Sequence, residues 1–241
     1  MEVINDLVGI NNLKIFQNDD WFKFSLESVL LPYFVTVNLK CKNVLDLCTG
    51  NAPIPLILST RTKAKIIGVE IQEDVYSLAK KSVSINNLDD QIKLINDDLV
   101  NLKNMYTGDN FDVITCNPPY FKNIELSKKN IDEHKVIARH EVAVTLEDII
   151  KTAVYLLKND GYFAMVHRTE RFFEVTDLLK KYNLIPKKIQ FIYPKIDTES
   201  NLFMIECVKN GKSGVKFLSP LYIHNEDGTY RDNIKKIFQM K

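Results

Sequence analysis

The stretch "NVLDLCTGNAPIPLIL", residues 43–58, decides the fold. Its first five residues form a short apolar run, as in a strand buried on both faces, and "PIPLIL" reads as a helix that opens with proline. A buried strand followed at once by a helix is the first half of a βαβ unit. The stretch therefore predicts a parallel sheet, with a turn between strand and helix where a ligand can bind.

The same alternation continues along the chain. Strands are expected at 65–70, 91–97, 111–117 and 161–168, and helices at 73–87, 145–160 and 171–183. Residues 187–195 and 201–209 are expected to close the sheet as a final antiparallel pair. In "TLED", Thr145 is expected to cap the helix in a capping box. The predicted fold is α/β, a doubly wound and mostly parallel sheet.

Length and composition suit one domain. The chain has 241 residues, of which 45% are hydrophobic, enough to bury a sizeable core. We expect a catalytic core at 43–241 and a short N-terminal extension at 1–42, in which 13–24 form a hairpin and 25–34 a helix. The polar, lysine-rich connection at 120–144 does not fit the alternation, and long connections of this kind are usually functional or mobile.

Charge and cysteine usage indicate a reduced, soluble protein. The formal net charge is +1, but residues 1–120 carry a net −4 and residues 121–241 a net +5, so the second half is better suited to meet a polyanion. The four cysteines lack metal or disulfide spacing, and neither a signal segment nor a membrane-length apolar run is present. We expect a cytoplasmic monomer without bound metal or membrane contact.

Four polar side chains end four of the predicted strands: Asp46, Glu70, Asp98 and Asn117. In a doubly wound sheet, ligands bind beyond the carboxyl ends of the strands. Gly50 lets the backbone turn sharply beside a ligand. The stretch "DLCTGNAP" lacks the glycines of a dinucleotide-binding turn, which argues against a pyrophosphate. A plain strand-to-helix turn capped by Asp46 is the alternative.

The next two strand ends suit an adenosine. Glu70, followed by Ile71, can accept hydrogen bonds from both ribose hydroxyls, although a solvated acid at a strand end is equally common. Asp98 can accept from an adenine amino group, and Leu99 offers an apolar surface and a backbone amide. An adenosine cradle without a phosphate site indicates S-adenosylmethionine, whose methyl group is already activated for a correctly placed nucleophile.

The fourth strand ends in "NPPYF", residues 117–121. The prolines fix φ angles and remove donors, so the Asn117 side chain and the Pro118 carbonyl form a rigid acceptor corner. Hydrogen bonds from a planar NH₂ group to these acceptors favour the pyramidal geometry of attack and stabilise the charge that develops on nitrogen. Tyr120 can stack on the target for about 1 to 3 kcal/mol, and Phe121 adds an apolar wall. A turn with a packed tyrosine is the alternative.

These motifs together resemble the class I S-adenosylmethionine-dependent amino-methyltransferases. Within that class the chain looks like the bacterial tRNA1(Val) adenine-N6 methyltransferase family, which methylates the adenine 3′ of the anticodon. The resemblance covers nearly the whole chain and includes "FKFSLESVLLPYF", "GVEIQED", "FDVITCNPPY", "ARHEVAVTLEDI" and "KNGKSGVKFLSPLYIHNEDGTY". Ala52 stands where the family usually has glycine.

The resemblance implies roles for individual residues. Predicted cofactor contacts are Phe24, Ser25, Asp46, Gly50, Glu70, Ile71, Asp98, Leu99 and Asn117. The predicted catalytic motif is Asn117, Pro118, Pro119 and Tyr120. Phe24 and Ser25 belong to the N-terminal extension, which is expected to close over the methionine part of S-adenosylmethionine.

The implied partner is a tRNA anticodon stem-loop, whose target base has to leave its stack to reach the corner. Candidate RNA-binding residues are Phe121, Arg139, His140, Lys187, Lys188, Lys195, Lys209, Lys212 and Lys216. Each cation alone is equally compatible with an ordinary solvated surface.

Three other functions fit part of the pattern. Glutamine methyltransferases of translation release factors use the same corner, but they carry a helical domain for which 42 residues before the first strand are too few. Guanine-amino methyltransferases of rRNA typically have a duplicated domain. A non-catalytic RNA-binding module is disfavoured by the intact Asn117, Pro118 and Tyr120.

Overall fold

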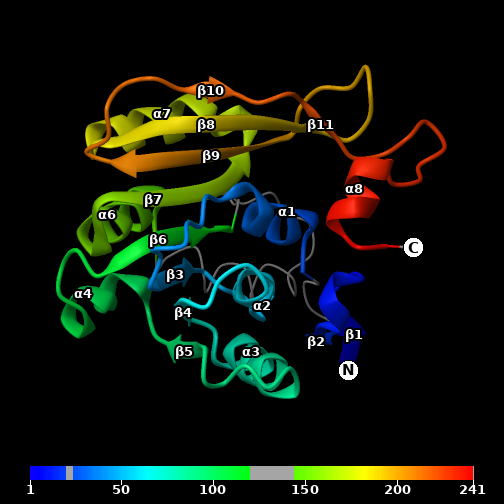
Figure 1. Ribbon diagram of the computed structural model, residues 1–241, viewed down its shortest axis with the longest axis horizontal. Coiled ribbons are helices and arrows are strands. Elements are labelled where there is room, and N and C mark those ends of the chain that lie inside the picture. The colour runs from blue at the N-terminus through cyan, green and yellow to red at the C-terminus, as the bar shows by residue number, and fades with distance from the viewer. Residues whose placement is uncertain (20–23, 120–143, 241) are drawn as a thin grey trace, which may run out of the picture.

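A central β-sheet lies between two layers of helices in the computed structural model, which describes residues 1–19, 24–119 and 144–240 (Figure 1). Its strands are β3 (Asn43–Leu47), β4 (Lys65–Glu70), β5 (Ile92–Asn96), β6 (Phe111–Cys116), β7 (Leu157–Arg168), β8 (Leu184–Tyr193), β9 (Leu202–Lys209), β10 (Lys216–Phe217) and β11 (Leu221–Tyr222). Their order is β10-β8-β9-β7-β6-β3-β4-β5, and β11 also pairs with β8. All pairs are parallel except those of β9 with β7 and β8, which confirms the predicted doubly wound sheet.

The direction in which successive strands are added to the sheet reverses at β3. The chain runs outward from β3 through β4 to β5 and then returns to place β6 on the other side of β3. The helices that follow β3 and β6 cover opposite faces of the sheet, so the carboxyl ends of these two strands mark the switch point at which ligands bind in such folds. All four predicted strand ends lie on this edge of the sheet.

The predicted antiparallel pair is confirmed, but it does not end the sheet. β9 is inserted between β7 and β8, so β8 runs parallel to the other strands. The C-terminal segment then adds β10 and β11 to the outer side of β8. These two-residue strands form hydrogen bonds with backbone N–H and C=O groups of β8 that an edge strand would otherwise expose.

Helices cover both faces of the sheet (Figure 1). One face carries α1 (Leu26–Phe34), α2 (Pro53–Ser59) and α3 (Glu73–Ile85), and the other carries α4 (Leu102–Met105), α6 (Leu146–Leu156) and α7 (Phe172–Lys181). In β3, Val44 packs into the first layer, whereas Leu45 and Leu47 pack into the second. Successive strand side chains point to opposite faces, so a sheet covered on both sides needs nearly continuous apolar strands.

The N-terminal extension is a hairpin followed by α1. β1 (Glu2–Asp6) pairs antiparallel with β2 (Lys14–Asn18). The hairpin predicted within 13–24 is therefore wrong in its pairing. Residues 14–18 form the second strand of the observed hairpin and pair with residues 2–6, which precede the predicted range. Leu7 and Ile10, between the two strands, are fully buried and anchor the connection. The helix predicted at 25–34 is confirmed as α1.

The N-terminal hairpin contacts the C-terminal segment, and the two ends of the chain lie on the same side of the molecule in Figure 1. The Gly9 amide donates to the carbonyl of Phe238, which directly follows α8 (Asp232–Ile237), at 2.9 Å. A Cβ at Gly9 would lie 2.5 Å from the Gln239 carbonyl oxygen, so this contact requires glycine. The Phe16 amide donates to Ser82 Oγ in α3 at 2.9 Å. The extension is thus packed against both α3 and the C-terminal segment.

The predicted capping box of α6 is confirmed. The Asp148 amide donates to Thr145 Oγ1 at 3.2 Å, and the Thr145 amide donates to Asp148 Oδ2 at 3.1 Å. The helix ends at Leu156, four residues before the predicted end. The reason is that Leu157, which is fully buried, already pairs with Phe111 as the first residue of β7.

Replacing Thr145 by alanine should lower the free energy of unfolding by about 1 kcal/mol, because one helix-terminal N–H loses its acceptor. Urea unfolding of the two proteins measures this difference. Thr107→Ala, at an exposed position outside any helix, is the control and should change stability by less than about 0.5 kcal/mol. Equal stability of wild type and Thr145→Ala would show that the cap contributes nothing.

Candidate active site

The loop after β3 adopts a conformation that most residues avoid. Cys48, Gly50 and Ala52 have φ angles of 57°, 58° and 72°, in the left-handed region. For a residue other than glycine this costs about 1 to 2 kcal/mol, so contacts with the rest of the protein must hold the loop. A Cβ at Gly50 would meet no atom within 4 Å, and a ligand can therefore approach this backbone closely.

Glu70, at the end of β4, ties this loop to the neighbouring strand. The side chain is nearly buried, with 6% exposure. Its Oε2 accepts from the Gly50 amide and its Oε1 from the Gln72 amide, both at 2.9 Å. A carboxylate offers about four lone-pair positions. Glu70 can therefore hold the loop and also accept a hydrogen bond from a ribose hydroxyl, as the sequence predicts.

Asp46, in β3, lies beneath the loop and has no solvent exposure. Its Oδ2 accepts from Thr49 Oγ1 at 2.6 Å and its Oδ1 from Thr115 Oγ1 at 2.7 Å. Burial raises the pKa of this carboxyl to about 7, although the two hydroxyl groups lower it, and the nearby Glu70 charge raises it further. The structure thus shows Asp46 joining the loop to β6. Its contact with the cofactor stays a prediction.

The predicted adenine side of the site lies after β5. Asp98 caps a short turn of helix, with Oδ1 accepting from the Val100 amide at 3.0 Å, and it is half-buried. Leu99 is buried, whereas Ile71, on the neighbouring strand end, is 42% exposed. An acid after β5 and an exposed isoleucine after the neighbouring β4 suit a base that needs both an acceptor and an apolar surface. These three contacts remain predictions.

Asn96 is a residue of this site that the sequence analysis missed. Its Nδ2 donates to the carbonyl oxygens of Glu70 at 2.8 Å and Ile71 at 3.1 Å. It therefore holds the end of β4, from which both predicted contacts project. The available signal was its position as the last residue of β5, where a polar side chain ends an apolar strand.

The acceptor corner directly follows β6. Pro118 is buried and Pro119 is exposed, while Asn117 is partly buried. The Asn117 Nδ2 donates to Ser25 Oγ at 3.3 Å, a contact between positions 92 residues apart. This brings together two predicted site residues from the N-terminal extension and the catalytic motif. Phe24 is also partly buried and packs against the core on the α1 side.

The extension also contacts the loop after β3. Asn51, which is 8% exposed, donates from Nδ2 to the carbonyl of Phe16 in β2 at 2.8 Å. The sequence analysis did not identify this residue, since an asparagine after a glycine reads as an ordinary turn residue. The extension thus touches both the loop and the acceptor corner, and its closure over the cofactor stays a prediction.

Four predicted residues lie outside the described part of the chain. They are Tyr120 of the catalytic motif and Phe121, Arg139 and His140 of the predicted RNA contacts.

Two of the predicted RNA-binding lysines form ion pairs inside the protein. The Lys188 ammonium lies 3.1 Å from Glu206 Oε1 and donates to the Phe34 carbonyl at 2.8 Å. The Lys209 ammonium donates to Asp109 Oδ1 and to the Leu157 carbonyl, each at 2.7 Å. Both side chains are better explained as parts of the fold than as phosphate contacts.

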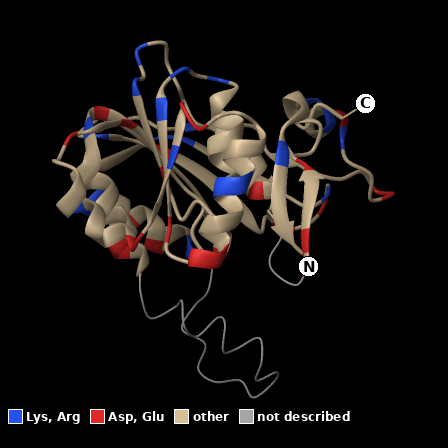
Figure 2. Cartoon of the chain, turned by 90° about the horizontal axis from the view of Figure 1, so that it is seen from below, with Lys and Arg blue, Asp and Glu red and all other residues tan. Residues whose placement is uncertain are grey.

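Of the other four lysines, one lies at the carboxyl edge of the sheet and three do not. Lys187 donates to the Lys212 carbonyl near the amino edge, and Lys216 pairs opposite Lys188 in the middle of β8. Lys195 follows the carboxyl end of β8, on the same edge as the candidate site, where its ammonium donates to the Glu226 carbonyl at 2.9 Å. In Figure 2, basic and acidic positions are interspersed over the described chain instead of forming one continuous basic face.

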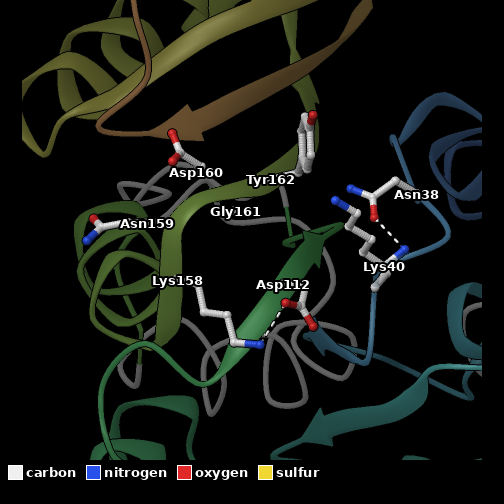
Figure 3. A pocket seen from close by; sticks show the side chains of 9 residues that line it. Asn38, Lys40, Asp112, Lys158, Asn159, Asp160, Gly161 and Tyr162 are labelled. Atoms are coloured by element: carbon white, nitrogen blue, oxygen red, sulfur yellow. Dashed lines mark hydrogen bonds and ion pairs between the residues drawn. The ribbon is translucent and has the colours of Figure 1, made fainter.

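A hollow of about 120 Å³ lies at the opposite edge of the sheet (Figure 3). It is lined in part by Lys40, Asp112 and Lys158, and Lys158 forms an ion pair with Asp112 at 2.7 Å. Asp112 Oδ2 also accepts from the Lys42 and Asn43 amides, each at 2.9 Å. These bonds fix the start of β3 against β6, which is a structural role remote from the acceptor corner.

No helix in 1–19, 24–119 or 144–240 is long and apolar enough to cross a membrane. The same residues contain no cluster of three or more His, Cys, Asp or Glu side chains that could hold a metal ion.

The hydrogen-bonding groups and apolar surface of the candidate site suit S-adenosylmethionine. The open backbone at Gly50 permits close approach, Glu70 offers a carboxylate at the next strand end, and Asp98 and the exposed Ile71 follow neighbouring strands. The loop also lacks the glycine-lined helix start that a pyrophosphate needs, since Ala52 precedes α2 in the left-handed region. These features suit a nucleoside without phosphates.

The raised pKa of Asp46 predicts stability that depends on pH. The folded protein keeps this proton up to about pH 7, whereas the unfolded chain releases it near pH 4. The contribution of Asp46 to the free energy of unfolding is therefore present at low pH and lost as pH rises toward neutrality. Asp46→Asn removes this titration. Urea unfolding should show wild type losing stability relative to Asp46→Asn between about pH 4 and about pH 8.

Comparing the two proteins cancels the titration of other groups. A stability difference that stays constant over this pH range would show that Asp46 titrates normally.

A family model described as "Methyltransferase domain" matches residues 39–234. The match covers the four strand ends and the acceptor corner and begins after α1.

Curated relatives carry the name tRNA1(Val) (adenine(37)-N6)-methyltransferase. The relative from Bacteroides thetaiotaomicron is 26% identical over 220 residues and covers 90% of each chain. The one from Flavobacterium johnsoniae is 29% identical over 174 residues and covers 72% of each chain. The resemblance predicted from the motifs is thus confirmed.

Solved structures share the fold. A protein from Agrobacterium tumefaciens described as a predicted O-methyltransferase has a TM-score of 0.70 at 15% identity, covering 89% of this chain and 96% of its own. The geranyl diphosphate C-methyltransferase from Streptomyces coelicolor has a TM-score of 0.57 at 10% identity, covering 76% and 78%. At these identities the likeness concerns the fold alone.

Proposed function

The chain belongs to the family of methyltransferase domains, and on that basis we propose that it methylates the N6 amino group of an adenine in tRNA. The predictions of a methyltransferase enzyme and of S-adenosylmethionine as its cofactor are confirmed by the family match and the named relatives. The observation that carries the finer proposal is the corner of Asn117 and Pro118, which follows β6 beside the loop held by Asp46 and Glu70.

The acceptor corner suits an amino group on a planar base. The lone pair of such a group is delocalised into the ring and is a poor nucleophile. Hydrogen bonds from its two N–H groups to the Asn117 side-chain oxygen and the Pro118 carbonyl favour a pyramidal nitrogen and stabilise its developing positive charge. The bound cofactor supplies an activated methyl group. The residues of this chain therefore orient the amine and stabilise charge, without a strong general base.

The loop and strand ends perform the complementary task. Glu70 and Gly50 form one wall of the predicted cofactor site, and Asp46 links that wall through Thr115 to the strand that carries Asn117. A rigid link between donor and acceptor positions matters because reacting atoms must be held within about 3 to 3.5 Å and aligned.

The names of the relatives support the adenine 3′ of the anticodon in tRNA1(Val) as the target. That base must leave its stack to reach the corner, and Tyr120 is proposed to stack on it there. Lys195 is the proposed phosphate contact from the described lysines, since it lies on the edge that carries the site. We propose a cytoplasmic monomer that acts on the anticodon stem-loop without a metal ion.

The competing function is methylation of a glutamine side chain, whose amide would fit the same two acceptors. The relatives that cover most of the chain are named for adenine, which favours the tRNA substrate.

Labelled S-adenosylmethionine offered with tRNA and with a release factor distinguishes these substrates. We expect N6-methyladenosine in tRNA and no label in the protein. Asn117→Ala should lower kcat by about 100-fold or more, as does removal of one preorganised hydrogen-bonding group in other enzymes. Nucleoside analysis of the labelled product provides the measurement.

Asn104→Ala, at an exposed position in α4, is the matched control and should keep full activity. Label in the release factor would show that the substrate is a protein. Full activity of Asn117→Ala would show that the acceptor corner has no role in the reaction.

Affinity for tRNA should depend on salt. A surface that neutralises about three phosphates loses on the order of 40-fold in affinity between 50 and 200 mM salt. Lys195→Gln should reduce the slope of log affinity against log salt by about 1, whereas Lys212→Gln, near the opposite edge, should leave it unchanged. Filter binding at several salt concentrations measures both slopes. Equal slopes for wild type and Lys195→Gln would exclude Lys195 from the interface.

A further inference from the structure

The N-terminal extension contacts the catalytic motif through one side chain. Ser25 Oγ accepts a hydrogen bond from Asn117 Nδ2 at 3.3 Å. Hydrogen bonds at catalytic groups are often long before the substrate binds and tighten in the complex. The bond occupies the donor end of the Asn117 amide. The oxygen end of that amide is the one that the proposed chemistry requires for the target amine.

The two ends of an asparagine amide have nearly the same shape but opposite hydrogen-bonding character. A half-turn of the Asn117 side chain would present its NH₂ group to the target NH₂ group, donor against donor. A serine hydroxyl can accept from the NH₂ end or donate to the oxygen end, so it stabilises the productive orientation once the target amine occupies the oxygen end. In this protein Ser25 provides the acceptor.

Ser25 is placed as if to cap a helix, but its hydroxyl does not do so. It is the N-cap residue of α1, where a serine side chain commonly accepts from the backbone of the first turn for about 1 kcal/mol. In α1 this side-chain cap is absent. Instead, the carbonyl of Ser25 accepts from the Ser28 amide at 3.2 Å and the Ser28 hydroxyl at 2.7 Å. The backbone of Ser25 is thus anchored while its hydroxyl contacts Asn117.

We propose that Ser25 is a positioning residue, whose hydroxyl holds the amide of Asn117 with its oxygen toward the target amine. This inference rests on the proposed function and deepens it, because it makes the acceptor corner a joint product of β6 and the N-terminal extension. It predicts an effect on the rate of methyl transfer, in contrast to a role of Ser25 in cofactor binding alone.

Ser25→Ala should lower kcat for an unmodified tRNA1(Val) transcript by about 10-fold. The KM for this tRNA and the dissociation constant of S-adenosylmethionine by calorimetry should each change less than about 2-fold. Ser25→Thr, which keeps the hydroxyl, should restore most of the rate. Ser84→Ala, at an exposed position in α3, is the matched control and should match wild type. Thermal unfolding of all variants identifies any loss of folding.

A double-mutant cycle separates positioning from other effects. If Ser25 acts through Asn117, adding Ser25→Ala to Asn117→Ala should lower kcat by less than about 2-fold. Weakened cofactor binding by Ser25→Ala with unchanged kcat would overturn the proposal, as would a full 10-fold loss in both backgrounds. Failure of Ser25→Thr to restore the rate would also count against it. If Asn117→Ala itself retains activity, or adenine is not methylated, the proposed function fails instead.

Discussion

The candidate site depends on one buried carboxylate, that of Asp46. A buried acid is costly unless its oxygens are hydrogen-bonded, and the two hydroxyls that satisfy it come from different elements, Thr49 in the loop and Thr115 in β6. The loop is thereby joined to the strand that carries Asn117 two residues after Thr115. The loop of the predicted cofactor site and the strand that carries the acceptor corner are therefore held by the same side chain.

A second carboxylate fixes the shape of the loop. Cys48 and Ala52 adopt backbone conformations that favour glycine, and such strain persists only where surrounding contacts impose it. Glu70 supplies one such contact at the Gly50 amide, and Asn51 supplies another by donating to the carbonyl of Phe16. The loop is thus held from β4 on one side and from the N-terminal hairpin on the other. Ala52, at a position where the resemblance implies glycine, adopts the left-handed backbone that glycine favours.

The N-terminal extension contributes to the site although the family match begins at residue 39. Its hairpin holds Asn51, and Ser25 contacts Asn117. The hairpin is itself anchored to α3 and to the C-terminal segment, where Gly9 permits a close approach. The position of the hairpin is therefore set by contacts with α3 and with the C-terminal segment. This explains how a segment outside the matched range reaches the acceptor corner.

The sequence by itself determined the strands from β3 to β9, the helices α1, α2, α3, α6 and α7, and the four polar strand ends, because apolar periodicity and the edge at which parallel strands end are local properties of the chain. It did not determine the pairing of the N-terminal hairpin or the environment of the lysines. Lys209 ends the antiparallel strand β9 at the edge opposite the site, whereas Lys195 follows β8 at the edge that carries the site, although both lysines come after apolar runs. The contacts of Asp46 with Thr115 and of Ser25 with Asn117 join residues 69 and 92 positions apart. Only tertiary structure could decide these features, because each depends on which distant segment the folded chain places alongside.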